Sequence, residues 1–489
     1  MPNTHRIIVD GEPMTANEPQ SHLDADPGSL LSDLLRRRDV HGTLTLIAQA
    51  ASHGTLPDHQ LAAVVRFLLE REPEGDGRGG PLSLQELELC CELASSVILS
   101  PDMAFGVQVS DSAWSMAHRA AYQQLPDGEA DGYVPRSLAL YRQIAPTQQE
   151  TARFDFEAAY EEAYGITIDQ VWTIGHALWG WCLEHPGESF DAASLATHIG
   201  DDGIDAKQVE SFLAIMACDY ATFRSMLGVP SGSHPHFEPY NINPFRKYPI
   251  LKLPDGKYLT PILSYLLRRI THGLYYDLIE LDRGGFIRLV ANSFSVYVGK
   301  LLTGQTDVRQ LSDRGAWHVN GADATLVIGC ITRPFGALSR STGDREHLRA
   351  DLARSGGVAD CVKRVREAIA ASDAKRVIGL VVAVEDFYLG NGPFIQSVVN
   401  EVLEAQGQPP MDADIQLAHV SGLEALSALS TRSDVGLVEL LAAKVDHADY
   451  RGLELDAYAR YQSATLCPGQ APSLRPQVLD DAAATFLGS

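Results

Sequence analysis

The sequence predicts two parts, a largely α-helical N-terminal region followed by an α/β domain with a mixed sheet. Between residues 28 and 228, apolar residues recur at three- and four-residue steps, which is the periodicity of amphipathic helices. The segment 228–249 is rich in Pro, Gly and Asn and indicates a junction. After Gly304, short apolar strands alternate with helical stretches, a pattern typical of a sheet covered by helices.

The N-terminal region is expected to begin after a flexible polar arm at residues 1–27, which lacks the basic start and apolar core of a signal peptide. In one of the expected helices, Ser83 precedes Glu86 with the spacing of a capping box. Helices are predicted within "SLLSDLLRRR", "PDHQLAAVVRFLLERE", "PLSLQELELCCELASSVILS", "TIDQVWTIGHALWGWCLEH" and "DAKQVESFLAIMACDYATFRSML".

The second part is expected to open with a β-hairpin, because "ILKLPDGKYLTP" has two extended runs around Pro254-Asp255-Gly256. Two helices follow in "ILSYLLRRITHGLYYDLIEL" and "GFIRLVANSFSVYVGKLLTG", and three strands in "ATLVIGCI", "RVIGLVVAVE" and "DIQLAHV". The predicted units are the arm at 1–27, a helical domain at 28–228, a linker with hairpin at 229–260, an α/β domain at 261–430 and a helical extension at 431–489.

Composition limits the classes of function. The net charge of −24 argues against a nucleic-acid-binding surface that covers the whole chain, although a local basic groove remains compatible with it. The seven cysteines form no Cys-x-x-Cys pair, which favours reduced thiols in a bacterial-type cytoplasm. The sequence has no run of about 18 uncharged apolar residues, so we expect no membrane span. It also lacks a P-loop, a Gly-x-Gly-x-x-Gly after a strand and a Gly-x-Ser-x-Gly elbow.

The order of elements resembles the PD-(D/E)XK, or restriction-endonuclease-like, superfamily of nucleases, in the form of large bacterial proteins associated with phage defence. The resemblance covers roughly residues 235–429 and implies a restriction-endonuclease-like mixed sheet. It is carried by "YNINPFRKYPILKLPDGKYLTP", the helix ending "FSVYVGKLL", the strand "TLVIGCITRPF", the run "IGLVVAVEDFYLGN" and "DIQLAHVSGLEAL".

In that superfamily a strand carries Glu-x-Lys, with an Asp about a dozen residues upstream. The two acids bind a divalent metal that activates water, and the Lys orients the nucleophile. In this sequence the resemblance places Gly329 at the Glu position, Ile331 at the Lys position and Ala316 at the Asp position. Gly and Ile offer no oxygen ligand to a hard metal ion. The resemblance therefore implies a nuclease-like fold that has lost its metal site and needs no cofactor.

Three functions stay open at this point. The first is a non-catalytic nuclease-like protein that binds nucleic acid or a partner, within a bacterial phage-defence assembly as the resemblance implies. The second is a nuclease with a displaced, Mg²⁺-dependent site at Asp313, Asp323 or Glu385. The third is a helical scaffold that contacts a protein partner through its N-terminal region and binds no nucleic acid.

One stretch of this acidic chain has a net positive charge. Between Arg333 and Arg376 there are ten basic and six acidic residues, so a helix pair there could present a basic face to a phosphate backbone. The alternative is a solvated helix face with internal ion pairs. Arg246, Lys247, Arg268 and Arg269 could extend the basic face. The candidate nucleic-acid-binding residues are Arg333, Arg340, Lys363, Arg364 and Arg366.

Overall fold

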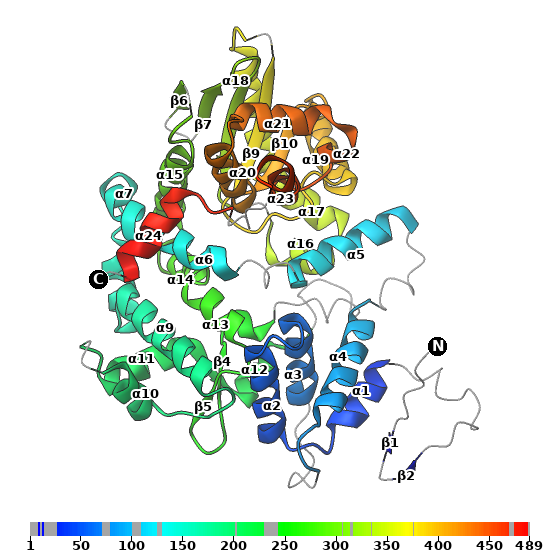
Figure 1. The fold of residues 1–489 in the computed structure, drawn as a ribbon, viewed down its shortest axis with the longest axis vertical. Helices are drawn as coiled ribbons and strands as arrows, with labels where there is room; N and C mark the ends of the chain where they lie inside the picture. The colour runs from blue at the N-terminus through cyan, green and yellow to red at the C-terminus, as the bar shows by residue number, and fades with distance from the viewer. Residues whose placement is uncertain are drawn as a thin grey trace.

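The structure, a computed structural model, describes residues 8–9, 12–13, 27–70, 79–99, 109–124, 130–200, 203–228, 243–305, 307–312, 316–333, 335–374, 376–468 and 474–487. Most of the predicted arm lies outside these ranges. Within it, β1 (Ile8–Val9) and β2 (Glu12–Pro13) pair antiparallel. In the view of Figure 1 the α/β domain lies above and most of the helical region lies below.

The first helices form a unit with its own core. The helices are α1 (Pro27–Leu35), α2 (Val40–Ser52), α3 (Asp58–Glu70) and α4 (Leu84–Leu99). The predicted capping box is confirmed, because Ser83 N donates to Glu86 Oε2 at 2.8 Å and Glu86 N donates to Ser83 Oγ at 3.3 Å. The core of this unit also takes in Phe223, Phe245 and Leu251, so the unit packs against the junction of the two predicted parts.

The middle of the chain is helical, with one interruption. Its elements are α5 (Val109–Gln124), α6 (Ala130–Ser137), the π-helical segment Leu138–Ile144, α7 (Ala145–Ala152), α8 (Phe156–Tyr164), α9 (Ile168–Glu184), α10 (Ala192–Ile199), α11 (Ala206–Met216) and α12 (Tyr220–Met226). The prediction of one helix over 205–227 is wrong, because β3 (Ala217–Asp219) separates α11 from α12. Pairing of β3 with a strand 33 residues later leaves no periodic signal in the sequence.

The predicted hairpin is confirmed. The strands β4 (Ile250–Lys252) and β5 (Tyr258–Leu259) pair antiparallel, and β3 joins β4 in parallel to complete a small sheet. Gly256 supplies the positive φ of 87° that the turn needs. The helix predicted next divides into α13 (Leu263–Ile270) and α14 (Leu274–Leu281), and α15 (Arg283–Leu301) follows. The turn between α13 and α14 requires Gly273, since a Cβ there would collide with the Arg269 carbonyl oxygen.

The sheet of the α/β domain is mixed, with strand order β10-β9-β8-β7-β6. Its strands are β6 (Val308–Ser312), β7 (Ala316–Asn320), β8 (Thr325–Ile331), β9 (Val377–Ala383) and β10 (Ile415–His419). Neighbours pair antiparallel from β6 to β8 and parallel from β8 to β10. The three predicted strands are confirmed. The strand β7, which Ala316 and Trp317 open, was not predicted, because this half-exposed part of the sheet has no continuous apolar run.

Helices cover both faces of this sheet. One face packs beneath α17 (Arg345–Leu352), α18 (Val358–Ala370) and α19 (Pro393–Ala405), and α16 (Ala337–Thr342) follows β8. The other face packs against α15 and α20 (Val420–Arg432). The chain ends in α21 (Leu437–Asp446), α22 (Ala448–Arg451), α23 (Leu455–Leu466) and α24 (Gln477–Leu487). The last of these returns to lie beside α6 (Figure 1).

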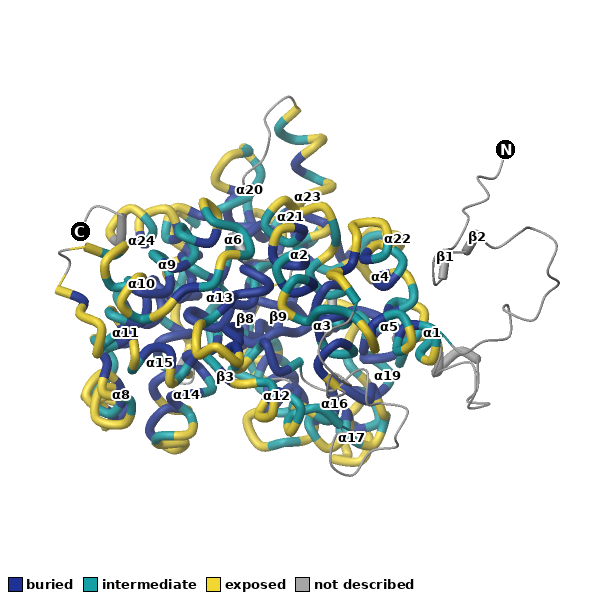
Figure 2. The backbone as a smooth tube through the Cα atoms, turned by 90° about the horizontal axis from the view of Figure 1, so that it is seen from below, coloured by how far each residue is buried: buried dark blue, intermediate teal, exposed yellow. Residues whose placement is uncertain are grey.

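The cores do not follow the predicted domain bounds. The largest apolar cluster runs from Leu138 to Ala482 and joins helices α6–α11 to α13–α15 and to one face of the sheet. Tyr122 of α5 belongs to the cluster on the opposite face of the sheet. Figure 2 shows the buried segments, β8 and β9 among them, in the middle of the molecule. Among the described residues, the helices include none that is both long enough and apolar enough to cross a membrane.

Candidate anion-binding site

The three positions that the resemblance assigns to the catalytic Asp, Glu and Lys share one face of the sheet. Ala316 in β7 lies directly opposite Gly329 in β8, and Ile331 is two residues further along the same strand. The helix α18 covers this face. A Cβ atom added at Gly329 would lie 2.5 Å from Cys361 Sγ and 2.9 Å from Val365 Cγ2. The place that the resemblance assigns to a carboxylate is therefore filled by the apolar side of α18.

The displaced-site candidates do not come together. Asp323 is exposed in the turn before β8, whereas Glu385 is buried just after β9. Because β8 and β9 run parallel, with Thr325 opposite Val377, these two acids lie beyond opposite ends of strands that themselves span roughly 20 Å. Asp313 lies outside the described residues. Within the described ranges, no group of three or more His, Cys, Asp or Glu side chains is placed to hold a metal ion.

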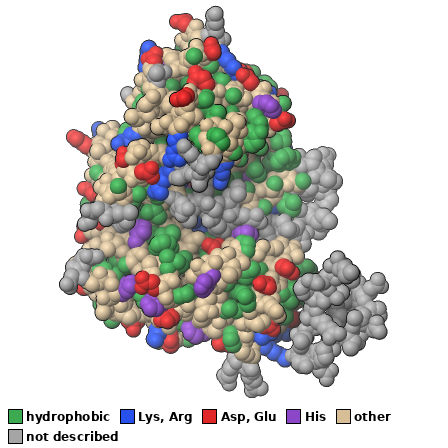
Figure 3. Space-filling view, in the orientation of Figure 1, with side chains coloured by type: hydrophobic (Ala, Val, Ile, Leu, Met, Phe, Trp, Pro, Cys, Tyr) green, Lys and Arg blue, Asp and Glu red, His purple; other side chains and the backbone are tan. Residues whose placement is uncertain are grey.

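The predicted basic face does not form as one surface. Arg366 donates to Asp412 Oδ2 at 2.9 Å, which is an internal ion pair of the kind that the alternative interpretation of this stretch predicts. Arg340 is buried. Lys363 is exposed on α18, next to the half-buried Arg364. Arg333 lies half-buried after β8, and its buried Nε has no hydrogen-bond partner in the part of the chain that the structure describes. Figure 3 shows acidic and basic side chains interspersed over the visible face of the α/β domain.

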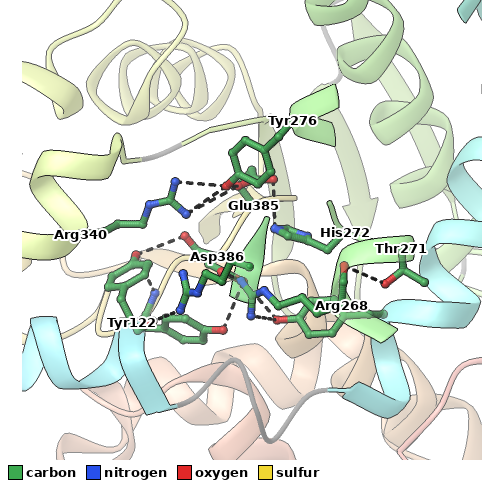
Figure 4. A network of polar contacts seen from close by, with 11 residues as sticks. Tyr122, Arg268, Thr271, His272, Tyr276, Arg340, Glu385 and Asp386 are labelled. Carbon is green, nitrogen blue, oxygen red and sulfur yellow. Dashed lines mark hydrogen bonds and ion pairs between the residues drawn. The ribbon is translucent and has the colours of Figure 1, made fainter. Parts of the chain in front are cut away.

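Arg340 instead points into a buried polar network at the end of β9 (Figure 4). Its guanidinium donates to Tyr276 Oη at 3.1 and 3.2 Å and lies 4.0 Å from Glu385 Oε2. Tyr276 in turn donates to Glu385 at 2.9 Å, and His272 Nε2 lies 3.4 Å from the other carboxylate oxygen. Burial by itself would raise the pKa of Glu385, but His272 and Arg340 lower it overall. The carboxylate is therefore held in its charged form.

Asp386 forms the second half of this network. It accepts from Arg268 Nη2 at 2.6 Å and from Tyr133 Oη at 3.3 Å. Burial opposes its ionisation, yet the Arg268 charge, followed by His272, brings the pKa of Asp386 well below its usual range. A charged pair thus ties α13 to the end of β9, and the Tyr133 hydrogen bond ties α6 to the same carboxylate. The network links the helical region to the α/β domain.

A cavity of about 260 Å³ lies beside this network. It is bounded by α5, the short 3-10 turn Pro244–Arg246, α13, α14 and α16. Tyr122 and Tyr276 contribute aromatic rings to its wall. Five cationic side chains of the described residues line it, namely Arg246, Lys247, Arg268, Arg269 and Arg340.

The cations differ in how far their charges are compensated. Arg268 is paired with Asp386, and Arg269 makes a bidentate pair with Asp277 at 2.8 Å for both bonds. Arg340 lies beside Glu385. The described residues place no carboxylate within ion-pair distance of Arg246 or Lys247. These two therefore carry the uncompensated positive charge of the cavity.

Arg246 is held in place without neutralisation. It donates to the backbone carbonyl of Tyr122, and its buried Nε has no hydrogen-bond partner among the described residues. Burial, followed by the nearby Arg268 charge, lowers the pKa of Arg246. A lowered pKa means that the guanidinium charge is poorly stabilised as it stands. A bound anion would relieve both the repulsion and the missing hydrogen bond.

The sequence indicated part of this site. Arg246, Lys247, Arg268 and Arg269 were expected only to extend a face formed by Arg333–Arg376, yet they lie at the cavity together with Arg340. Sequence reasoning missed His272 and Tyr276, for which the crowding of polar residues in "RRITHGLYYD" was the available signal. Nothing local marked Tyr122, which reaches the site from α5.

Searches among protein-family models, curated proteins and solved structures find no match to this chain.

Proposed function

We propose that the protein is a non-catalytic, nuclease-like protein that binds nucleic acid at the cavity between its helical region and its α/β domain. The observation that carries the proposal is the pair Arg246 and Lys247, which line the cavity without a carboxylate partner among the described residues. Phosphate oxygens are the natural partners of such groups, because Arg presents a rigid fork of donors and Lys a compact charge. The wider link to phage defence rests on the sequence resemblance alone.

The pairing of β7 with β8 supports the nuclease-like part of the proposal. A metal held jointly by the superfamily's Asp and Glu requires those two positions to be neighbours. Here Ala316 and Gly329 are direct cross-strand partners, whose side-chain positions lie about 5 Å apart in such pairs. The displaced-site alternative has less support, since Asp323 and Glu385 lie at opposite ends of the sheet.

The proposal is tested with labelled duplex DNA, single-stranded DNA and RNA, at low and moderate salt, with Mg²⁺, Mn²⁺ or EDTA. We expect binding that weakens as salt rises, because counterions are released on contact with phosphates, and no cleavage with either metal. Metal-dependent cleavage that disappears in Asp313→Asn, Asp323→Asn or Glu385→Gln would instead establish a displaced active site. Absence of binding to every probe would favour the helical scaffold.

Restoring the missing side chains should not restore cleavage. In the triple variant Ala316→Asp/Gly329→Glu/Ile331→Lys, the new Glu would have to displace Cys361 and Val365 and bury its charge. Overpacking combined with the burial of a charge should cost about 3 kcal/mol of unfolding free energy for Gly329→Glu alone. Urea unfolding measures this cost, with Ala316→Asp at the half-exposed neighbouring position as the milder control. Mg²⁺-dependent cleavage by the triple variant would show that α18 can move aside.

A further inference from the structure

The backbone that carries the two uncompensated cations is firmly anchored. Asn243 accepts from Phe245 N at 3.0 Å at the start of the 3-10 turn, and Phe245 itself is fully buried. Arg269 Nε donates to the Lys247 carbonyl oxygen at 2.9 Å. The Arg246 side chain is fixed by its bond to the Tyr122 carbonyl. The two cations are therefore adjacent along an anchored backbone, and the Arg246 guanidinium is held in place before any ligand arrives.

The size of the cavity restricts which ligand can reach Arg246 and Lys247. At about 260 Å³ it lies just below the usual range of small-molecule pockets, which begins near 300 Å³. A segment of duplex cannot enter such a space. One phosphate group with part of its nucleoside fits better, and the rings of Tyr122 and Tyr276 offer apolar surface for a sugar or base.

The charge balance distinguishes between two kinds of phosphate. An internal phosphodiester carries one negative charge, whereas a terminal phosphate monoester carries close to two at neutral pH. The lining holds two cations without a carboxylate partner among the described residues. Of the two lining acids, Asp277 is engaged by Arg269, and Glu280 is exposed, as Lys247 is, so the fixed charge that a phosphate meets inside the cavity is that of Arg246.

From these three observations we infer that the cavity binds a terminal phosphate monoester, either at the end of a nucleic-acid strand or on a free nucleotide. The inference rests on the proposed function and narrows it to one kind of phosphate. Recognition of a strand end would let the protein bind a cut or exposed terminus without reading its sequence. Arg246 presents a guanidinium that no carboxylate of the described residues engages, which favours hydrogen bonding to the oxygens of a phosphate.

The test compares one labelled single-stranded oligonucleotide in three forms, with a 5′-phosphate, with a 3′-phosphate and with hydroxyl groups at both ends. We expect a phosphorylated form to bind about tenfold more tightly or better than the hydroxyl form. A nucleoside monophosphate should compete for the site, whereas the matching nucleoside should not. In Lys247→Gln, which changes an exposed side chain and leaves the core intact, the preference for the phosphorylated form should shrink.

The outcomes separate this inference from the proposed function. Equal binding of all three oligonucleotides would overturn the inference and leave nucleic-acid binding in place. Binding of the monophosphate without any oligonucleotide would support the inference for a free nucleotide and overturn the proposed function. Binding of a phosphorylated form that inorganic phosphate and the nucleoside monophosphate both fail to displace would place recognition outside the cavity and overturn the inference.

Discussion

Replacing Arg246 and Lys247 together with glutamine should weaken nucleic-acid binding by roughly 100-fold. Each side chain would lose a charge-assisted hydrogen bond to phosphate. Because Lys247 is exposed and its charge is screened, the two losses together should come to about 3 kcal/mol. The slope of log binding constant against log salt should become shallower by about 1.4 for single strands, as expected when two phosphate contacts are removed. Fluorescence anisotropy titrations at several salt concentrations measure both quantities.

A control for net charge is available elsewhere on the surface. Arg309 and Arg460 are exposed and paired with Asp307 and Asp456, so Arg309→Gln/Arg460→Gln removes the same two charges far from the cavity lining. We expect this variant to bind almost as well as the unchanged protein. Lys363→Gln tests the face of α18 in the same assay. A larger loss in Lys363→Gln than in the cavity variant would move the binding surface from the cavity to α18.

Replacing Glu424 with alanine should destabilise the fold by about 3–5 kcal/mol. Arg136 of α6 donates to both carboxylate oxygens of Glu424 in α20 at 2.7 Å, and Tyr297 of α15 donates at 2.6 Å. All three side chains are buried, so removing the carboxylate would leave the Arg136 charge without its partner. The pair joins the helical region to the helix that covers the sheet. Its loss should therefore lower the free energy of unfolding of both parts of the molecule.

Urea unfolding of the variant, followed by circular dichroism, measures the loss. Glu401→Ala is a matched control, since Glu401 also pairs with an arginine, Arg345, but is half-exposed. Such a pair should contribute no more than about 1 kcal/mol. Similar small losses in both variants would mean that the buried pair does not hold the two parts together.

The Arg136–Glu424 pair also makes the free energy of unfolding depend on pH, and the direction of that dependence follows from the pKa of Glu424. Burial would raise the pKa of Glu424, but the charge of Arg136 and the hydrogen bonds from Arg136 and Tyr297 lower it overall. A carboxyl whose pKa is lower in the folded state stabilises the protein above its unfolded value, near 4.3, and loses that contribution as the pH falls through the folded value. Unfolding free energy should therefore decline below about pH 4, and more gently in Glu424→Gln.

The cavity shows why residue type alone could not locate the site. Arg340 and Lys363 are both basic residues in helices that follow β8, and nothing near either one tells which is buried. The structure turns Arg340 toward Tyr276, since α16 packs against α5 and α17, whereas Lys363 lies on an exposed side of α18. Compensation of charge is likewise a tertiary property. Arg268 and Arg269 are neighbours, yet they pair with Asp386 and Asp277, which lie on different elements.

The sequence by itself determined the elements whose signal is local. Apolar periodicity marked the long helices, the Ser83–Glu86 spacing marked a helix start, and continuous apolar runs marked β8, β9 and β10. Tertiary structure decided the rest. The strands β3, β6 and β7 are short and exist through pairing with distant segments, and the cavity joins residues from Tyr122 to Arg340. Contacts between segments far apart in the chain depend on packing and charge compensation, which leave no periodic trace in the sequence.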